Sequence, residues 1–219
     1  MRKSLIALCI VFASFACILS SCDETLVLSK EIKNIVPDST LTKITDLGMP
    51  INKGKKPTSL ENYYKASPFI LKESNIAADV IGRSFSDYNF HLYDQDNDNL
   101  SIKLDYSNGG EEGTGLGGFI SGNGNDFSVF IKVHSTYQGY EADIIHIISG
   151  TMSPEGIKDM YFANFMLDNK GNAGKVWIEN EQGRVIYDSD GLSPIVTSLQ
   201  AKVLDKVIGV SAAGNFIKK

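Results

Sequence analysis

Four aspartates lie in the segment DQDNDNLSIKLD, which spans residues 94–105, and the first three recur at every second position. Asp94, Asp96 and Asp98 hold its first, third and fifth positions, and Asp105 holds its twelfth. This spacing can place carboxylate oxygens around one calcium ion. A hairpin turn would explain the same residues, because Asp and Asn both favour tight turns. We therefore take the four aspartates as candidate calcium ligands and keep an ordinary turn as the alternative.

Three histidines, His91, His134 and His146, fall within segments predicted as strands. If Gln138 and Gly139 make a two-residue turn, His134 lies opposite Asp143 and His146 lies opposite Ile131. A His–Asp pair could serve catalysis, but the sequence has no Gly-x-Ser-x-Gly motif to supply a nucleophile. It also lacks His-Glu-x-x-His and Cys-x-x-Cys, which are typical of zinc sites. We interpret His134 and Asp143 as a surface pair and assign no catalytic residue.

The segment GGEEGTGLGG contains Gly113, Gly115 and Gly118 at the spacing of a dinucleotide-binding loop. Such a loop needs a helix directly after it, to hold the pyrophosphate at the helix N-terminus. The β-rich FISG follows instead. We interpret these glycines as a flexible connection between strands and predict no nucleotide cofactor.

Three aromatic residues are candidate ligand contacts. Tyr137 and Tyr140 flank the predicted turn, and Trp177 lies in the predicted strand KVWIE. Such rings can stack on sugars or line a pocket, and the alternative is that they cover the rim of the core. Paired carboxylates in a cleft would indicate a glycosidase, but a sequence does not show their separation.

Strands are needed to position these residues, and the period-two pattern from residue 69 to 188 predicts them. In NLSIKLDY, Leu100, Ile102, Leu104 and Tyr106 point to one face. Seven further strands are predicted over 88–93, 117–121, 127–135, 141–149, 158–167, 175–179 and 183–188, which makes eight, and residues 67–72 are a candidate for a ninth.

Helical spacing appears on both sides of this region. A short helix is predicted from Asp38 or Ser39 to Gly48, docking through Leu41, Ile44 and Leu47. A C-terminal helix is predicted over 193–209, with Ser193 as N-cap and Pro194 at its first position. The fold class is therefore all-β, an antiparallel meander of about eight strands closing into a barrel or a sandwich. A meander followed by one helix resembles the lipocalin-like barrels over residues 63–208, which implies a ligand-binding β-domain.

The N-terminus reads as an export signal, with Arg2 and Lys3 before an apolar run over 5–19. The run is too short to span a bilayer comfortably. Leu19-Ser20-Ser21-Cys22 then resembles the lipobox of bacterial lipoproteins. That resemblance implies cleavage before Cys22, acylation of its thiol with palmitate-type chains, and membrane attachment through the lipid.

Removing residues 1–21 takes the formal net charge from −5 to −7 and leaves 198 residues, enough for one core without disulfides. The acidic balance and the absence of a basic stripe argue against nucleic acid as a partner. We expect a signal peptide (1–21), a tether with a short helix (22–57), a β-domain (58–192) and a C-terminal helix and tail (193–219).

We expect a lipid-anchored protein of the cell envelope, at the outer membrane. Its β-domain would bind an apolar or glycan ligand, or act in envelope assembly, without catalysis. A hydrolase acting on glycans is the alternative. Asp23 and Glu24 leave the membrane and leaflet open, because acidic residues after the lipidated cysteine direct sorting differently among bacterial groups.

Overall fold

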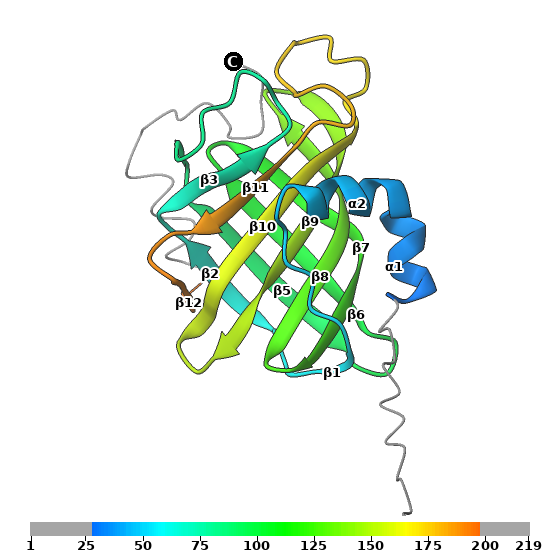
Figure 1. The fold of residues 1–219 in the computed structure, drawn as a ribbon, viewed down its shortest axis with the longest axis vertical. Helices are drawn as coiled ribbons and strands as arrows, with labels where there is room; N and C mark the ends of the chain where they lie inside the picture. The colour runs from blue at the N-terminus through cyan, green and yellow to red at the C-terminus, as the bar shows by residue number, and fades with distance from the viewer. Residues whose placement is uncertain (1–27, 198–219) are drawn as a thin grey trace, which may run out of the picture.

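The computed structural model describes residues 28–197, which form two short helices and a strongly curled sheet (Figure 1). The helices are α1 (Lys30–Ile35) and α2 (Asp38–Asp46). The strands are β1 (Lys55–Pro57), β2 (Asn62–Ala66), β3 (Phe69–Ser74), β4 (Ser84–Phe85), β5 (Tyr88–Asp96), β6 (Ser101–Asn108), β7 (Glu111–Gly124), β8 (Asp126–Tyr137), β9 (Tyr140–Ser153), β10 (Gly156–Asp168), β11 (Gly183–Asp188) and β12 (Leu192–Pro194).

The strands belong to one sheet that curls into a half-barrel. Ten of them follow the order β2-β5-β6-β7-β8-β9-β10-β11-β3-β4. The run from β5 to β10 is an antiparallel meander, as the sequence predicts. β1 pairs in parallel with β7, and β12 pairs with β10. Just beyond β12, Val196 donates its backbone N–H to the Tyr63 carbonyl of β2 at 2.9 Å. This segment is thus bonded both to β10 and to β2, which lies at one end of the order.

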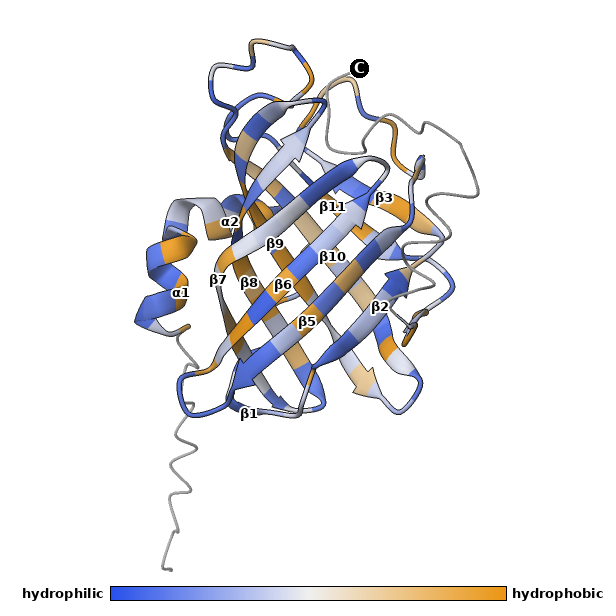
Figure 2. Cartoon of the chain, turned by 180° about the vertical axis from the view of Figure 1, so that it is seen from behind, coloured by the Kyte–Doolittle hydropathy of each residue, from blue (hydrophilic) through white to orange (hydrophobic). Residues whose placement is uncertain are grey.

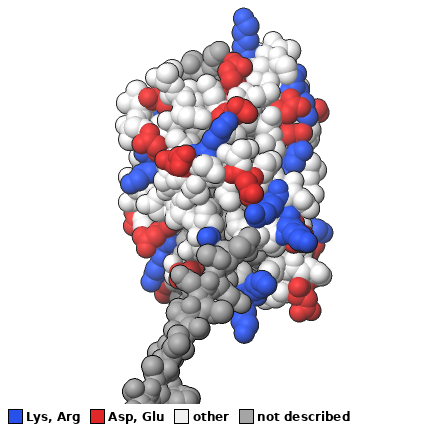
Figure 3. All heavy atoms as spheres, turned by 45° about the vertical axis from the view of Figure 1, so that its right-hand side comes forward, with Lys and Arg blue, Asp and Glu red and all other residues white. Residues whose placement is uncertain are grey.

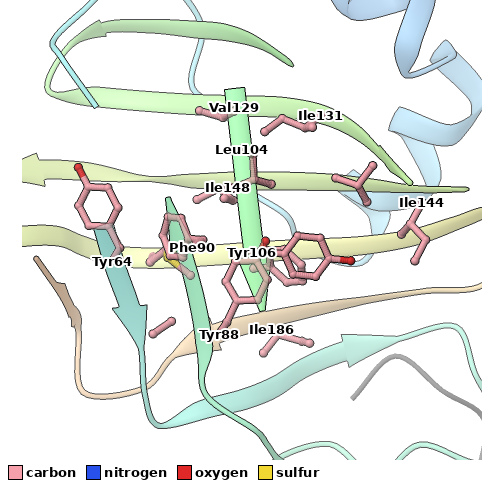
Figure 4. Close-up of a cluster of buried hydrophobic side chains, with 14 of the residues drawn as sticks. Tyr64, Tyr88, Phe90, Leu104, Tyr106, Val129, Ile131, Ile144, Ile148 and Ile186 are labelled. Atoms are coloured by element: carbon pink, nitrogen blue, oxygen red, sulfur yellow. The ribbon is translucent and has the colours of Figure 1, made fainter. Parts of the chain in front are cut away.

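Burial that alternates from one residue to the next gives the sheet an apolar inner face. Along β6, Ile102, Leu104 and Tyr106 are buried while Lys103 and Asp105 are exposed, and hydropathy alternates along β5 and β6 (Figure 2). The predicted strand containing Leu104 is thereby confirmed. Figure 4 shows Tyr88, Phe90, Leu104 and Tyr106 pointing from β5 and β6 toward aliphatic side chains of the facing strands.

A second apolar cluster covers the outer face of the sheet. Residues 28–49 pack against that face, because Ile32, Val36 and Ile44 contact apolar side chains of β8 to β11. The predicted docking of Leu41, Ile44 and Leu47 is confirmed, with Ile44 buried and the other two half-buried. Helix α1, which the sequence pattern does not predict, completes this cover.

One predicted strand is wrong. Residues 175–179 form part of an irregular segment, because the side-chain amide of Asn172 bonds both backbone groups of Trp177, at 3.0 and 2.8 Å. These bonds take the place of a neighbouring strand. Asn169 likewise bonds to the Ile178 carbonyl. The side chains of Trp177 and Ile178 are buried in the interior cluster.

The predicted start of the C-terminal helix is wrong, because those residues form a strand. Ser193 and Pro194 lie in β12, and the Ser193 hydroxyl donates to Asp188 Oδ2 at 2.6 Å instead of capping a helix. The remaining residues of that prediction, 198–209, lie outside the described part of the chain. Within residues 28–197, no helix is long and apolar enough to cross a membrane. On the face shown in Figure 3, acidic and basic side chains are interspersed.

Candidate functional site

Seven neighbouring strands, β5 to β11, contribute buried polar side chains to the interior of the half-barrel, and we single out one from each strand. We call these residues the polar belt: Tyr88, Tyr106, Glu111, Ser135, His146, Asn164 and Arg184. Apolar residues of the interior cluster lie on the same strands. His146, Asn164 and Arg184 are directly opposite one another on β9, β10 and β11. Polar side chains in an otherwise apolar interior are costly unless they are bonded, so their partners are informative.

Glu111 is the only carboxyl group in the belt. Its Oε1 accepts hydrogen bonds from the Tyr106 hydroxyl at 2.5 Å and from the Ser135 hydroxyl at 2.6 Å. Its Oε2 is buried and has no hydrogen-bond partner among residues 28–197. Burial raises the pKa of Glu111 to about 7, although the bonds from Ser135 and Tyr106 act to lower it. Near neutral pH this carboxyl group therefore lies close to the midpoint of its titration.

The glycines of β7 make room for this contact. A Cβ on Gly113 would lie 2.5 Å from a ring carbon of Tyr106, and one on Gly115 or Gly118 would lie 2.7 Å from Ile131. The interpretation of these glycines as a connection between strands is wrong, because all three lie inside β7. The missing side chain of Gly113 lets Tyr106 cover the strand and reach Glu111, and those of Gly115 and Gly118 make room for Ile131.

His146 sits among aromatic rings at the centre of the belt. Its Nδ1 is 3.3 Å from the Tyr88 hydroxyl, and its Nε2 is 3.3 Å from the Asn164 Nδ2. The rings of Tyr106 and Phe162 meet it edge-on, with centroids 4.7 and 4.8 Å away. Burial lowers the pKa of His146 to about 3, so the imidazole stays neutral at ordinary pH. Asn164 Oδ1 is buried and lacks a hydrogen-bond partner in the described part of the chain.

Arg184 closes one side of the belt. It binds Asp79 through two hydrogen bonds, Nε to Oδ2 at 2.6 Å and Nη2 to Oδ1 at 3.0 Å. Burial alone would raise the pKa of Asp79, but the bonds and charge of Arg184, with help from Ser74 and Arg83, hold it below its ordinary value. The buried guanidinium is thus matched by a carboxylate.

The aromatic residues singled out from the sequence come together at one hairpin. Tyr137 and Tyr140 are opposite each other beside the Gln138-Gly139 turn. Trp177 is completely buried, and its ring centroid lies 6.3 Å from that of Tyr137. Tyr140 is 41 % exposed and covers Gly174. Tyr137 and Trp177 therefore belong to the core, and of the three only Tyr140 presents its ring to solvent.

The predicted register of the same hairpin is confirmed. His134 is opposite Asp143, with Nδ1 and Oδ1 3.0 Å apart, and His146 is opposite Ile131. Lys170 also binds Asp143, at 2.7 Å. His134 and Asp143 thus form a surface ion-pair network outside the half-barrel, as interpreted from the sequence.

The four candidate calcium ligands have other partners or lie apart. Asp96 accepts bonds from the backbone of Asp98 and Asn99, which is turn chemistry. Asp94 pairs with Lys103 at 2.7 Å, and Asp105 lies out along β6. Among residues 28–197, no three His, Cys, Asp or Glu side chains are arranged to hold a metal ion. The geometry gives calcium no support, and calcium binding stays a prediction. Cys22 lies outside the described residues.

Sequence reasoning missed the polar belt, although a signal for Glu111 was present. Gly109 and Gly110 both have positive φ, and the turn they make sets Glu111 opposite Asn108. Because side chains alternate along a strand, Asn108 and Tyr106 face the same way. A Gly-Gly turn could therefore have predicted that Glu111 points inward beside Tyr106.

Comparisons of this chain with protein-family models, curated proteins and solved structures find no significant match. Its function must therefore be inferred from its own geometry and chemistry.

Proposed function

We propose that this chain is a lipid-anchored protein of the cell envelope whose half-barrel binds a small ligand, without catalysis, at the polar belt. One observation carries the binding part: Glu111 Oε2 and Asn164 Oδ1 are buried without a hydrogen-bond partner among the described residues, inside an otherwise bonded cluster. Leaving such acceptors unsatisfied costs about 1–3 kcal/mol each, so a bound partner supplying hydrogen-bond donors would be favoured.

The anchoring part rests on the sequence Leu19-Ser20-Ser21-Cys22. Lipid acylation at Cys22 would hold the domain at a membrane, which we take to be the outer membrane. An apolar ligand with a polar end, or a glycan fragment, fits a site in which a polar belt adjoins an aliphatic and aromatic interior.

Binding is favoured over catalysis by the state of the belt's ionisable groups. His146 is held neutral by burial and cannot act as an acid near neutral pH. Arg184 is engaged by Asp79.

A glycan hydrolase is the second candidate, and Glu111 is the observation that favours it. A general acid needs a raised pKa, and burial raises that of Glu111 to about 7 while the pKa of Asp79 is lowered. Loss of glycan cleavage in Glu111→Gln, with full cleavage in Glu112→Gln, would support this candidate.

Native mass spectrometry tests the binding proposal. The full chain, purified in mild detergent, is exposed to a lipid and glycan extract of the source cells and compared with Glu111→Gln. Glu112→Gln is the matched control, because Glu112 is the exposed neighbour on the same strand. We expect one retained small molecule in the wild type and the control, and a loss of at least tenfold in Glu111→Gln. Absence of any retained molecule from the wild type would contradict the proposal.

A further inference from the structure

The belt's unsatisfied atoms restrict the chemistry of its ligand. Glu111 Oε2 and Asn164 Oδ1 are both hydrogen-bond acceptors when Glu111 is ionised. The hydroxyl groups of Tyr106 and Ser135 already donate to the other oxygen of Glu111. A group that completes the site with Glu111 ionised must therefore be a donor.

Charge narrows the choice further. No ion pair joins Glu111 to any Lys, Arg or His of residues 28–197. Arg184, the belt's cation, is bound by both oxygens of Asp79. An ionised Glu111 in this interior thus lacks a counter-charge, and a buried carboxylate is stable only when it is paired. An anionic ligand would add a second negative charge, whereas a neutral hydroxyl would leave the first one unmatched.

Aromatic rings surround the same place. Tyr106 lies 5.5 Å from Tyr88 and 4.7 Å from His146 between ring centroids, and Tyr88 lies 4.5 Å from Phe162. The faces of Tyr and Phe rings attract cations through their quadrupoles. A carboxyl group beside a cluster of rings is a suitable environment for a small organic cation that also donates hydrogen bonds.

We infer that the belt recognises a primary ammonium group, with Glu111 as its counter-ion. This inference rests on the proposed function, because it names the ligand's polar end. A primary ammonium carries N–H donors for the unsatisfied Oε2 of Glu111. Without a ligand, the Glu111 carboxyl group is neutral below pH 7, and the amine in solution is already protonated. When the ammonium binds, the carboxyl group releases its proton to solvent. The bound pair is then a carboxylate and an ammonium, whose charges balance.

Three four-carbon probes test the inference on the full chain in non-ionic detergent: n-butylamine, n-butanol and butyrate. We expect n-butylamine to raise the melting temperature at pH 8, and the other two probes to have no effect. The rise should vanish in Glu111→Gln and persist in Glu112→Gln. An equal rise with n-butanol, no rise with n-butylamine, or a rise that persists in Glu111→Gln would overturn the inference.

Calorimetry of the wild type keeps the test independent of whether Glu111→Gln folds. Titrations of n-butylamine at pH 6 in two buffers of different ionisation enthalpy should show close to one proton released per amine bound. The affinity should rise about tenfold per pH unit below pH 7 and level off above it. Proton release near zero at pH 6 would overturn the inference. If the envelope extract yields a bound ligand that has no amine, the proposed function stands and this inference falls.

Discussion

The Tyr106 hydroxyl lies 2.5 Å from Glu111 Oε1, across the Gly109-Gly110 turn that joins β6 to β7. The Ser135 hydroxyl binds the same oxygen from β8. Both donors thus meet one oxygen, which leaves Oε2 buried and unbonded by the described residues. This asymmetry distinguishes Glu111 from a carboxyl group that is fully enclosed by its own network.

Glu111 should make the stability of the domain depend on pH. Its folded-state pKa, about 7, lies above the ordinary value of 4.5, so the folded state holds the proton more tightly. The contribution of Glu111 is fully present below about pH 4.5 and is lost as the pH rises through 7, a change of about 3 kcal/mol. Urea unfolding from pH 4.5 to 8 should therefore show Glu111→Gln gaining stability relative to the wild type. Parallel curves for the two proteins would contradict this.

His146 should act in the opposite direction. Burial lowers its pKa from 6.5 to about 3, so its contribution is present above pH 6.5 and is lost as the pH falls toward 3. In the Glu111→Gln background, which removes the opposing effect, we expect several kcal/mol of loss between pH 7 and 4. The further change His146→Gln should abolish that dependence. Titration of the His146 ring signals by NMR between pH 7 and 5 would show that this assignment is wrong.

Gly113 should tolerate no side chain. Alanine there would place Cβ 2.5 Å from the Tyr106 ring, which must then move away from Glu111. We expect Gly113→Ala to lower the free energy of unfolding by about 1–3 kcal/mol. Thr114→Ala, at the neighbouring exposed position, is the control and should change it by less than about 0.5 kcal/mol. Equal stability of the two variants would mean that the close approach is unimportant.

The N-terminal helices should unfold together with the sheet. Ile44 is 1 % exposed and packs in the outer cluster, so Ile44→Ala should cost about 2–4 kcal/mol. Ser39→Ala, on the exposed side of α2, should cost almost nothing. Far-UV circular dichroism and Trp177 fluorescence should report one shared transition in both variants. Separate transitions would indicate that the helices are an independent unit.

The fold was largely predictable because period-two burial is local. The strand containing Leu104 and the pairing of His134 with Asp143 follow from alternation and a two-residue turn alone. The segment around Trp177 was not predictable in this way. Its residue types are typical of a strand, but the Asn172 amide bonds to the Trp177 backbone. That contact depends on a loop conformation that the alternation of apolar and polar residues does not predict.

The candidate site was harder to predict from the sequence than the fold was. Glu111 and Glu112 are adjacent, and only the register set by the Gly109-Gly110 turn decides which of them faces inward. The partners of Glu111 come from β6 and β8, so the belt exists only once the sheet has curled. Tyr137 and Trp177 were easier to notice by type, yet burial makes them part of the core.

Cys22 should be the point of membrane attachment. Replacing it with Ala removes the thiol that the lipobox would acylate, while Cys17→Ala changes a cysteine within the apolar run and serves as the control. We expect Cys22→Ala to leave the membrane fraction after an alkaline wash, to remain unprocessed and to incorporate no labelled palmitate. Cys17→Ala should behave like the wild type. Retention of washed Cys22→Ala in the membrane would contradict lipid anchoring.

A lipid on Cys22 would also limit the distance between the domain and the membrane surface. Only five residues separate Cys22 from Leu28, which is buried against the sheet. Six extended steps span about 20 Å, so a lipid on Cys22 would hold the outer cluster within that distance of the membrane surface. Energy transfer from Trp177 to a dansyl-labelled lipid should therefore depend on the length of this connection. It should fall when a twenty-residue Gly-Ser insert follows Glu24. Equal transfer in the two proteins would show that the short connection does not determine the position of the domain.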